Sequence, residues 1–205
     1  NDESFRQFTL DTKQLEPATL YALLQNFKGI LGFTPTVIIN GDAGDHLGMY
    51  SKYVTYDVRG NVGPLCSQGV EHCRYFIDGD AGRNFASGAK DSLFVVKVKA
   101  EQITGEYERK SGIGPQHCVF KTVNEETLDT FLREIPANNK IYFIEEDGTE
   151  VLYRDYCQPL GAHRQTTSER NKKKEHRKEA YRKKKQVEEM IEKLSLEDQS
   201  LQEKV

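Results

Sequence analysis

The stretch KIYFIEEDGTEVLYRDY, residues 140–156, decides our expectation of the fold. Two runs rich in β-branched and aromatic residues, 140–145 and 150–156, flank the turn Glu146-Asp147-Gly148-Thr149. Asp-Gly between two such runs is typical of a β-hairpin, because both turn residues tolerate a positive φ. We therefore predict an antiparallel hairpin here.

Working outward from the hairpin, further runs of the same composition predict strands. They span residues 36–40, 52–58, 73–78, 92–100 and 118–123. Asn124 can cap a short helix that runs through Ile135, and apolar residues at helical spacing predict another helix over 11–27. Because few helices separate the strands, we expect an α+β fold with mixed or antiparallel β-sheets. We recognise no internal repeat.

The charge of the chain is unevenly distributed. The 205 residues carry a net charge of -3, with 37% hydrophobic residues, which excludes a transmembrane protein, a collagen-like fibre and a wholly disordered acidic tail. Residues 164–185 hold eleven Lys or Arg and three Glu. We therefore expect a globular domain at 1–160 and a charged helical tail at 161–205. The tail is basic first and amphipathic over 187–205, where an apolar stripe would dock on another surface, in cis or in trans.

The four cysteines do not predict a disulfide scaffold or a metal site. Cys66, Cys73, Cys118 and Cys157 are few for this length, no Asn-X-Ser/Thr sequon occurs, and no Cys-x2-Cys pair is present. We expect ordinary buried thiols, no metal and no membrane partner. The same features favour an intracellular protein of the nucleus or cytoplasm.

Three elements in order resemble a known family. The strand at 36–39 ends in Asn40-Gly41-Asp42, a later strand carries Tyr75, and Glu150 opens the last strand. This order is similar to the ADP-ribosyltransferases of the poly(ADP-ribose) polymerase type. The resemblance implies NAD as substrate and a catalytic set of Asn40, Tyr75 and Glu150. Gly41 would offer its backbone to the nicotinamide carboxamide, Tyr75 would stack on the nicotinamide ring, and Glu150 would stabilise the oxocarbenium-like transition state.

The resemblance leaves two functions open. Asn40 replaces the histidine of the family, and Asp42 places negative charge where a pyrophosphate must approach. The domain is either an enzyme that transfers ADP-ribose to a macromolecular target or a catalytically silent relative. A second, shorter resemblance covers residues 53–88 and is similar to the cytochrome b5-like, membrane-associated progesterone-receptor family. It implies a haem-binding protein in which a tyrosine such as Tyr56 would ligate the iron.

The basic segment carries a separate hypothesis, that of a non-catalytic assembly module. A helix with this charge neutralises phosphates of RNA or DNA, or binds an acidic protein partner. The alternative is a solvated helix or a nuclear-localisation address. The residues predicted to bind nucleic acid are Lys172, Lys173, Lys174, Arg177, Lys178, Arg182, Lys183, Lys184 and Lys185.

Overall fold

The computed structural model describes residues 7–16, 21–29, 34–103 and 114–155. The chain divides into two compact units, Asn1–Leu160 and Gly161–Val205. All described residues belong to the first unit. The predicted tail helix lies outside them.

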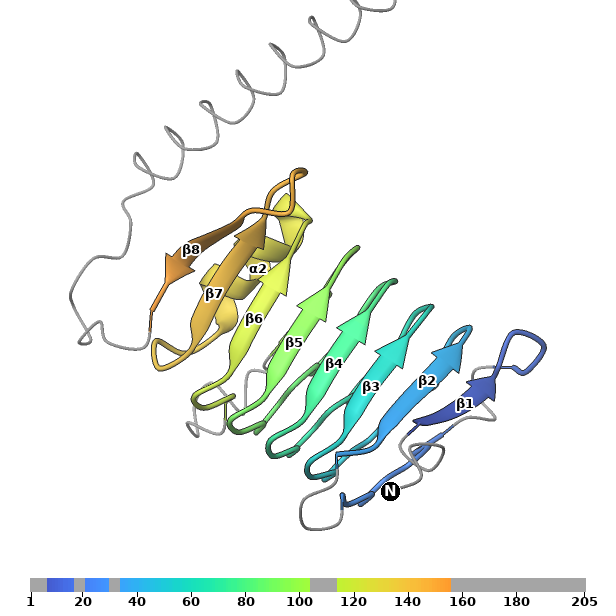
Figure 1. Ribbon diagram of the computed structural model, residues 1–205. Coiled ribbons are helices and arrows are strands. Elements are labelled where there is room, and N and C mark those ends of the chain that lie inside the picture. The colour runs from blue at the N-terminus through green and yellow to red at the C-terminus, as the bar shows by residue number, and fades with distance from the viewer. Residues whose placement is uncertain (1–6, 17–20, 30–33, 104–113, 156–205) are drawn as a thin grey trace, which may run out of the picture. The chain divides into compact units, whose positions relative to one another are not determined.

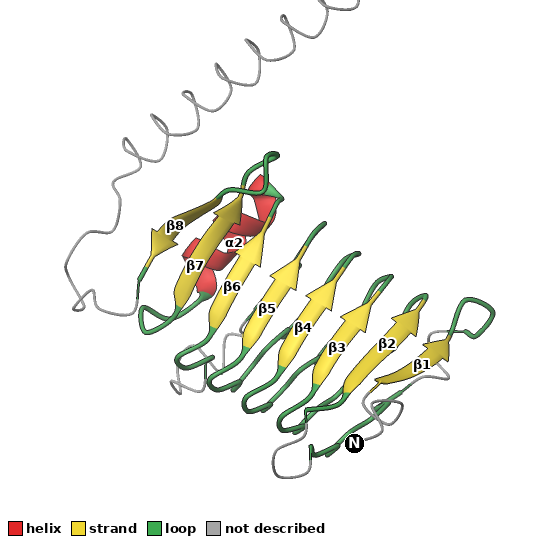
Figure 2. Ribbon diagram, viewed as in Figure 1, coloured by secondary structure: helices red, strands yellow, loops and turns green. Residues whose placement is uncertain are grey.

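One eight-stranded sheet organises the first unit, and its strands follow one another in space in the order in which they follow along the chain (Figures 1 and 2). Strands β1 to β7 are parallel to their neighbours, whereas β7 and β8 pair antiparallel. The strands are β1 (Gln7–Asp11), β2 (Thr36–Asn40), β3 (Thr55–Val58), β4 (Arg74–Ile77), β5 (Leu93–Val96), β6 (Val119–Thr122), β7 (Lys140–Ile144) and β8 (Glu150–Arg154).

The central strands repeat at a fixed interval. Thr36 pairs with Thr55, Thr55 with Arg74, and Arg74 with Leu93, each step spanning 19 residues. Single β-bridges repeat the same step on two further sides of the coil, as in the series Ala43, Val62, Ala81 and Ala100 and the series Lys52, Glu71 and Lys90. The unit is therefore a parallel β-solenoid, whose coils from β2 to β5 have 19 residues each. Our expectation of a chain without an internal repeat is wrong.

A six-residue arc with the same backbone conformation recurs in the coils between β1 and β5. In the first arc, Ala22, Leu24 and Asn26 have positive φ, and the equivalent residues His46, Gly48 and Tyr50 repeat this alternation one coil later. Alternating left-handed residues are incompatible with an α-helix. The helix predicted over 11–27 is therefore wrong for the described residues of that range. Leu23, Leu24 and Phe27, which suggested it, pack against the core from the arc and the residue that follows it.

The core contains a column of stacked aromatic rings. Tyr56, Tyr75, Phe94 and Phe120 occupy the same inward position of β3 to β6, and successive ring centroids lie 4.6, 5.6 and 5.0 Å apart. The two tyrosine hydroxyls are satisfied inside the core, since Tyr56 bonds to the Ser51 hydroxyl at 2.9 Å and Tyr75 donates to the Gly48 carbonyl at 3.3 Å. The column thus combines apolar burial with fully paired polar tips.

Gly-Asp and Gly-Asn turns follow β2, β3 and β4, and their Asp or Asn side chains form hydrogen bonds between neighbouring coils. We call each of these side-chain hydrogen bonds a rung. The side chains of Asp42, Asn61 and Asp80 each accept a hydrogen bond from a backbone N–H of the next coil, at 2.7, 2.8 and 3.0 Å. The glycine before each rung allows the coils to approach, because a Cβ on Gly60 would lie 2.4 Å from the Gly41 carbonyl oxygen. These glycine-rich stretches are therefore turns of the solenoid.

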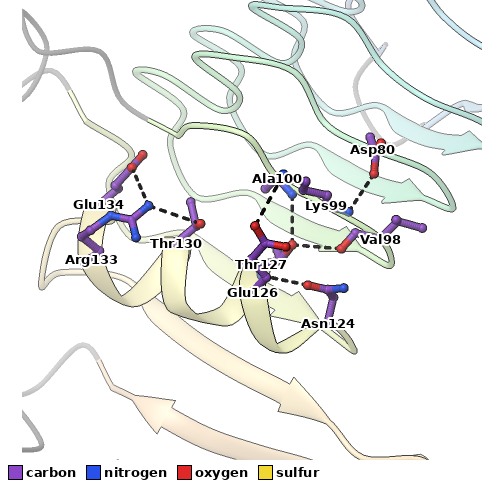
Figure 3. Close-up of polar contacts among 10 residues, drawn as sticks. All are labelled: Asp80, Val98, Lys99, Ala100, Asn124, Glu126, Thr127, Thr130, Arg133 and Glu134. Atoms are coloured by element: carbon purple, nitrogen blue, oxygen red, sulfur yellow. Dashed lines mark hydrogen bonds and ion pairs between the residues drawn. The ribbon is translucent and has the colours of Figure 1, made fainter. Parts of the chain in front are cut away.

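Helix α2 (Glu125–Glu134) packs against β6 and β7 and covers the core beside the last solenoid coil, and Figure 3 shows its polar contacts with that coil. Asn124 is its N-cap, as predicted, and accepts from the Thr127 N–H at 2.9 Å. The Thr127 hydroxyl donates to the Val98 carbonyl at 2.9 Å and accepts from the Ala100 N–H at 3.0 Å. It therefore satisfies backbone groups that another coil would otherwise pair. Phe131 closes the aromatic column edge-on at 5.3 Å from Phe120.

The prediction of a mixed sheet with helical elements is confirmed in outline, and its strand pairing is corrected. The hairpin of β7 and β8 and helix α2 lie where the sequence predicts them, with Gly148 at φ +84° in the turn. The other strand pairs are parallel, because solenoid arcs return the chain to the start of the next strand between β2 and β5, and helix α2 does so between β6 and β7. Within the described ranges, no helix has both the length and the apolar character needed to cross a membrane.

Candidate functional site

Asn40 and Gly41 lie at the end of β2 and are engaged by neighbouring segments. The Asn40 side-chain oxygen accepts from Arg59 Nη1 at 3.2 Å, and its carbonyl accepts from the Thr12 N–H at 3.0 Å. A Cβ on Gly41 would lie 2.8 Å from Thr12 Oγ1 and 2.9 Å from the Lys13 nitrogen. The chain itself therefore occupies the space beside Gly41 that a nicotinamide carboxamide would need.

Tyr75 is a core residue. Its side chain is 0% exposed, and its ring stacks between Tyr56 and Phe94. Burial raises the pKa of its phenol well above the ordinary value, which keeps the hydroxyl neutral. Because both ring faces are covered by other rings, Tyr75 does not stack on a ligand, and its predicted role in a nicotinamide site is corrected.

Glu150 lies at the other end of the sheet. Six strand steps separate β8 from β2, and at about 4.8 Å per step this distance is roughly 29 Å. The Glu150 carboxylate pairs with Lys121 Nζ at 2.6 Å on the outer face of the sheet. In a solenoid, residues far apart in sequence stay far apart in space. The catalytic set Asn40, Tyr75 and Glu150 therefore does not form one cleft.

Tyr56, the predicted haem ligand, is also buried. It is 0% exposed, its hydroxyl bonds to Ser51, and burial raises the pKa of the phenol. An iron ligand must reach an open cavity with its oxygen, and this hydroxyl points into packed core. The structure thus contradicts the predicted ligation by Tyr56.

The described cysteines are the buried free thiols that the sequence predicts. Cys73 Sγ donates to the Glu71 carbonyl and Cys118 Sγ to the Gln116 carbonyl, each two residues back in the chain. Burial raises the pKa of Cys73 to about 11 and that of Cys118 to about 12, and it also raises the pKa of Cys66. Such thiols stay protonated at neutral pH and are poor nucleophiles. Cys157 lies outside the described residues.

The surface of the coils carries charges that pair across neighbouring coils. Lys52 Nζ lies 2.5 Å from the Glu71 carboxylate, and this hydrogen bond lowers the pKa of Glu71. Lys97 pairs with Asp78 at 2.6 Å in the same manner. Among the described residues, no group of three or more His, Cys, Asp or Glu side chains is arranged to hold a metal ion. The pairs Lys52–Glu71 and Lys97–Asp78 therefore link neighbouring coils.

The sequence analysis missed an apolar surface in the first coil. Phe8, Leu15 and Tyr21 are 46%, 51% and 65% exposed. Phe8 pairs in register with the inward-facing Val37, so it occupies a core position that is left uncovered. The alternation of polar and apolar residues in Gln7–Asp11 is the sequence signal for this strand.

Comparison of the chain with protein-family models, curated proteins and solved structures finds no match in any of the three. ADP-ribosyl transfer with NAD stays a prediction that no comparison supports. The residues predicted to bind nucleic acid, Lys172 to Lys185, lie outside the described part of the chain.

Proposed function

We propose that this protein is a non-catalytic binding and assembly module, in which the β-solenoid is a stable base and the basic segment 164–185 binds RNA or DNA. The observation that carries the proposal is the placement of Asn40, Tyr75 and Glu150. Asn40 is bonded to Arg59, Tyr75 is stacked in the core, and Glu150 is paired with Lys121. By strand count, Glu150 lies roughly 29 Å from Asn40.

Two further features support a binding role. The thiols and phenols with raised pKa values are neutral core groups near pH 7, so these groups supply no activated nucleophile or general base. The basic segment concentrates a formal charge of +8 in 22 residues of a chain whose total is -3. That concentration favours phosphate contacts and the release of counterions.

The test is binding of the full chain to a labelled duplex and to a labelled single strand over a salt series. We expect the logarithm of the association constant to fall linearly with the logarithm of salt concentration. Replacing Lys172, Lys173 and Lys174 with Gln should make this negative slope shallower for the duplex, by up to about 3, since each phosphate contact contributes about -0.9.

A matched control separates the segment from general charge. Replacing Lys13, Lys28 and Lys90 of the solenoid with Gln removes the same formal charge. We expect this variant to keep the salt dependence of the wild type. Equal effects of the two triple variants, or binding that does not respond to salt, would contradict the proposal.

A further inference from the structure

The N-terminal end of the solenoid presents an open strand edge. β1 lies at the end of the sheet, and in the described part of the chain it pairs with β2 alone. The Thr12 N–H donates to the Asn40 carbonyl on β2. Because backbone groups alternate in direction along a strand, the N–H and C=O of Gln7, Thr9 and Asp11 point away from β2. The edge therefore offers three donors and three acceptors to another strand.

The core positions of β1 are uncovered on the same side. Phe8 and Leu10 pair in register with Val37 and Ile39, which are 1% and 0% exposed. Phe8 itself is 46% exposed, while Phe131 covers the equivalent end of the aromatic column at the other end of the solenoid. An exposed aromatic residue beside an open edge is typical of a strand-pairing interface.

We propose that a second copy of this chain occupies this edge, with the two β1 strands antiparallel about a two-fold axis at Thr9. This register places Thr9 opposite its own copy and Gln7 opposite Asp11, both as hydrogen-bonded pairs. In this register, the N–H and C=O groups of Gln7, Thr9 and Asp11, which point away from β2, form the hydrogen bonds between the two copies. Phe8 then faces Leu10 of the partner in the closer, non-hydrogen-bonded spacing, so each copy covers the open core of the other.

The charges of the first coil are compatible with this pairing. Its described charged residues are Asp11, Lys13, Glu16 and Lys28, which sum to zero, and the register opposes no like charges along β1. The other end of the sheet differs in its core and in its charged edge, which favours a closed pair over a longer assembly. There α2 closes the core, and the edge strand β8 begins and ends with charged residues. Glu150 pairs with Lys121, and Arg154 donates to the carbonyls of Leu132 and Ile135.

The test is sedimentation equilibrium of the full chain over a concentration series. We expect the mass to rise with concentration from 23.4 kDa to twice that value. Gln7→Lys places a positive charge opposite Asp11 of the partner, twice per dimer, and should lower the dissociation constant by roughly 2- to 30-fold. Gln7→Glu places a negative charge opposite the negative Asp11 of the partner, twice per dimer, and should raise the dissociation constant by a similar factor.

Controls at Thr55 keep the test specific. Thr55 has the same outward position on β3, two strands from the edge, so Thr55→Lys and Thr55→Glu should leave the dissociation constant unchanged. A chain that is monomeric at every concentration would overturn the proposal. The cover of Phe8 would then be another segment of the same chain or a different protein. A dimer that responds equally to the Gln7 and Thr55 variants would overturn it too, because its interface would lie elsewhere.

Discussion

The two ends of the solenoid differ in how their exposed backbone groups and core side chains are covered. Each coil has its backbone groups and core side chains covered by the next coil, so the last coil at either end leaves both exposed. At the C-terminal end, Thr127 satisfies the backbone and Phe131 covers the aromatic column. At the N-terminal end, β1 leaves an open edge and Phe8 is 46% exposed. The two ends therefore differ in their core, which α2 covers at one end and which is exposed at Phe8 at the other.

The largest expected effect distinguishes the two aromatic residues at these ends. Phe131 is 0% exposed, so Phe131→Ala should lower the free energy of unfolding by about 3–5 kcal/mol. Phe8→Ala removes a half-exposed ring and should cost about 1 kcal/mol. Denaturant unfolding of both variants at low protein concentration measures the difference. Equal losses of stability would break the distinction between a closed and an open end.

A smaller effect isolates the polar part of the C-terminal cap. Thr127→Val keeps the shape of the side chain but leaves the Val98 carbonyl and the Ala100 N–H without their partner (Figure 3). We expect a loss of about 1–3 kcal/mol in the free energy of unfolding. Thr130→Val on the same helix is the control, because the Thr130 hydroxyl accepts only a 3.4 Å bond from Arg133 and bonds to no carbonyl or N–H of the last coil. Similar losses for the two variants would mean that Thr127 does not act as a cap.

The coils between the ends should be sensitive to alkaline pH. Burial raises the pKa of Cys73 to about 11 and that of Cys118 to about 12, so above the ordinary thiol pKa the unfolded chain loses protons that the folded chain keeps. The free energy of unfolding should therefore fall as pH rises above about 9, by on the order of 1.4 kcal/mol per pH unit for each thiol. Urea titrations at pH 7, 9 and 10 measure this slope. The double variant Cys73→Ala and Cys118→Ala should show a shallower slope, and an unchanged slope would contradict the assignment.

The smallest effect concerns a single rung between the coils. Asn61→Ala removes the side-chain acceptor for the Asp80 N–H and should cost about 0.5–1.5 kcal/mol, since the rung is exposed. Asn61→Asp keeps an acceptor oxygen and should stay close to the wild type. Thermal unfolding of the two variants tests whether these side chains support the stacking of coils. A larger loss for the Asp variant would show that charge, and not hydrogen bonding, governs the rung.

The sequence predicts local elements of this protein better than their arrangement. The β7–β8 hairpin and α2 follow from Asp147-Gly148 and from the cap at Asn124, whose signals depend on neighbouring residues alone. The solenoid depends on equivalences 19 residues apart. The glycines Gly41, Gly60 and Gly79 recur at this spacing, whereas most other equivalent residues share only shape or hydrogen-bonding capacity, as with Asp42, Asn61 and Asp80. Their repetition is therefore hard to recognise in a single sequence.

The true surroundings of the candidate site residues could not be predicted either, because the order of motifs along the chain does not show which residues lie together in space. A motif order similar to that of a transferase says nothing about convergence in space when each strand simply lies beside the next one. Tyr75 illustrates the difficulty, because a tyrosine in a strand reads equally as a stacking platform or as a core ring. The core role follows only from the register that places it between Tyr56 and Phe94.

The most direct test of the central claim, that the residues resembling a catalytic set have structural roles, is incubation of the full chain with labelled NAD. Wild type and Glu150→Ala are compared in the presence of protein and nucleic-acid targets. The account predicts no transfer of label by either protein, because Tyr75 is buried and Glu150 pairs with Lys121 far from Asn40. Transfer by the wild type that is lost in Glu150→Ala would contradict it.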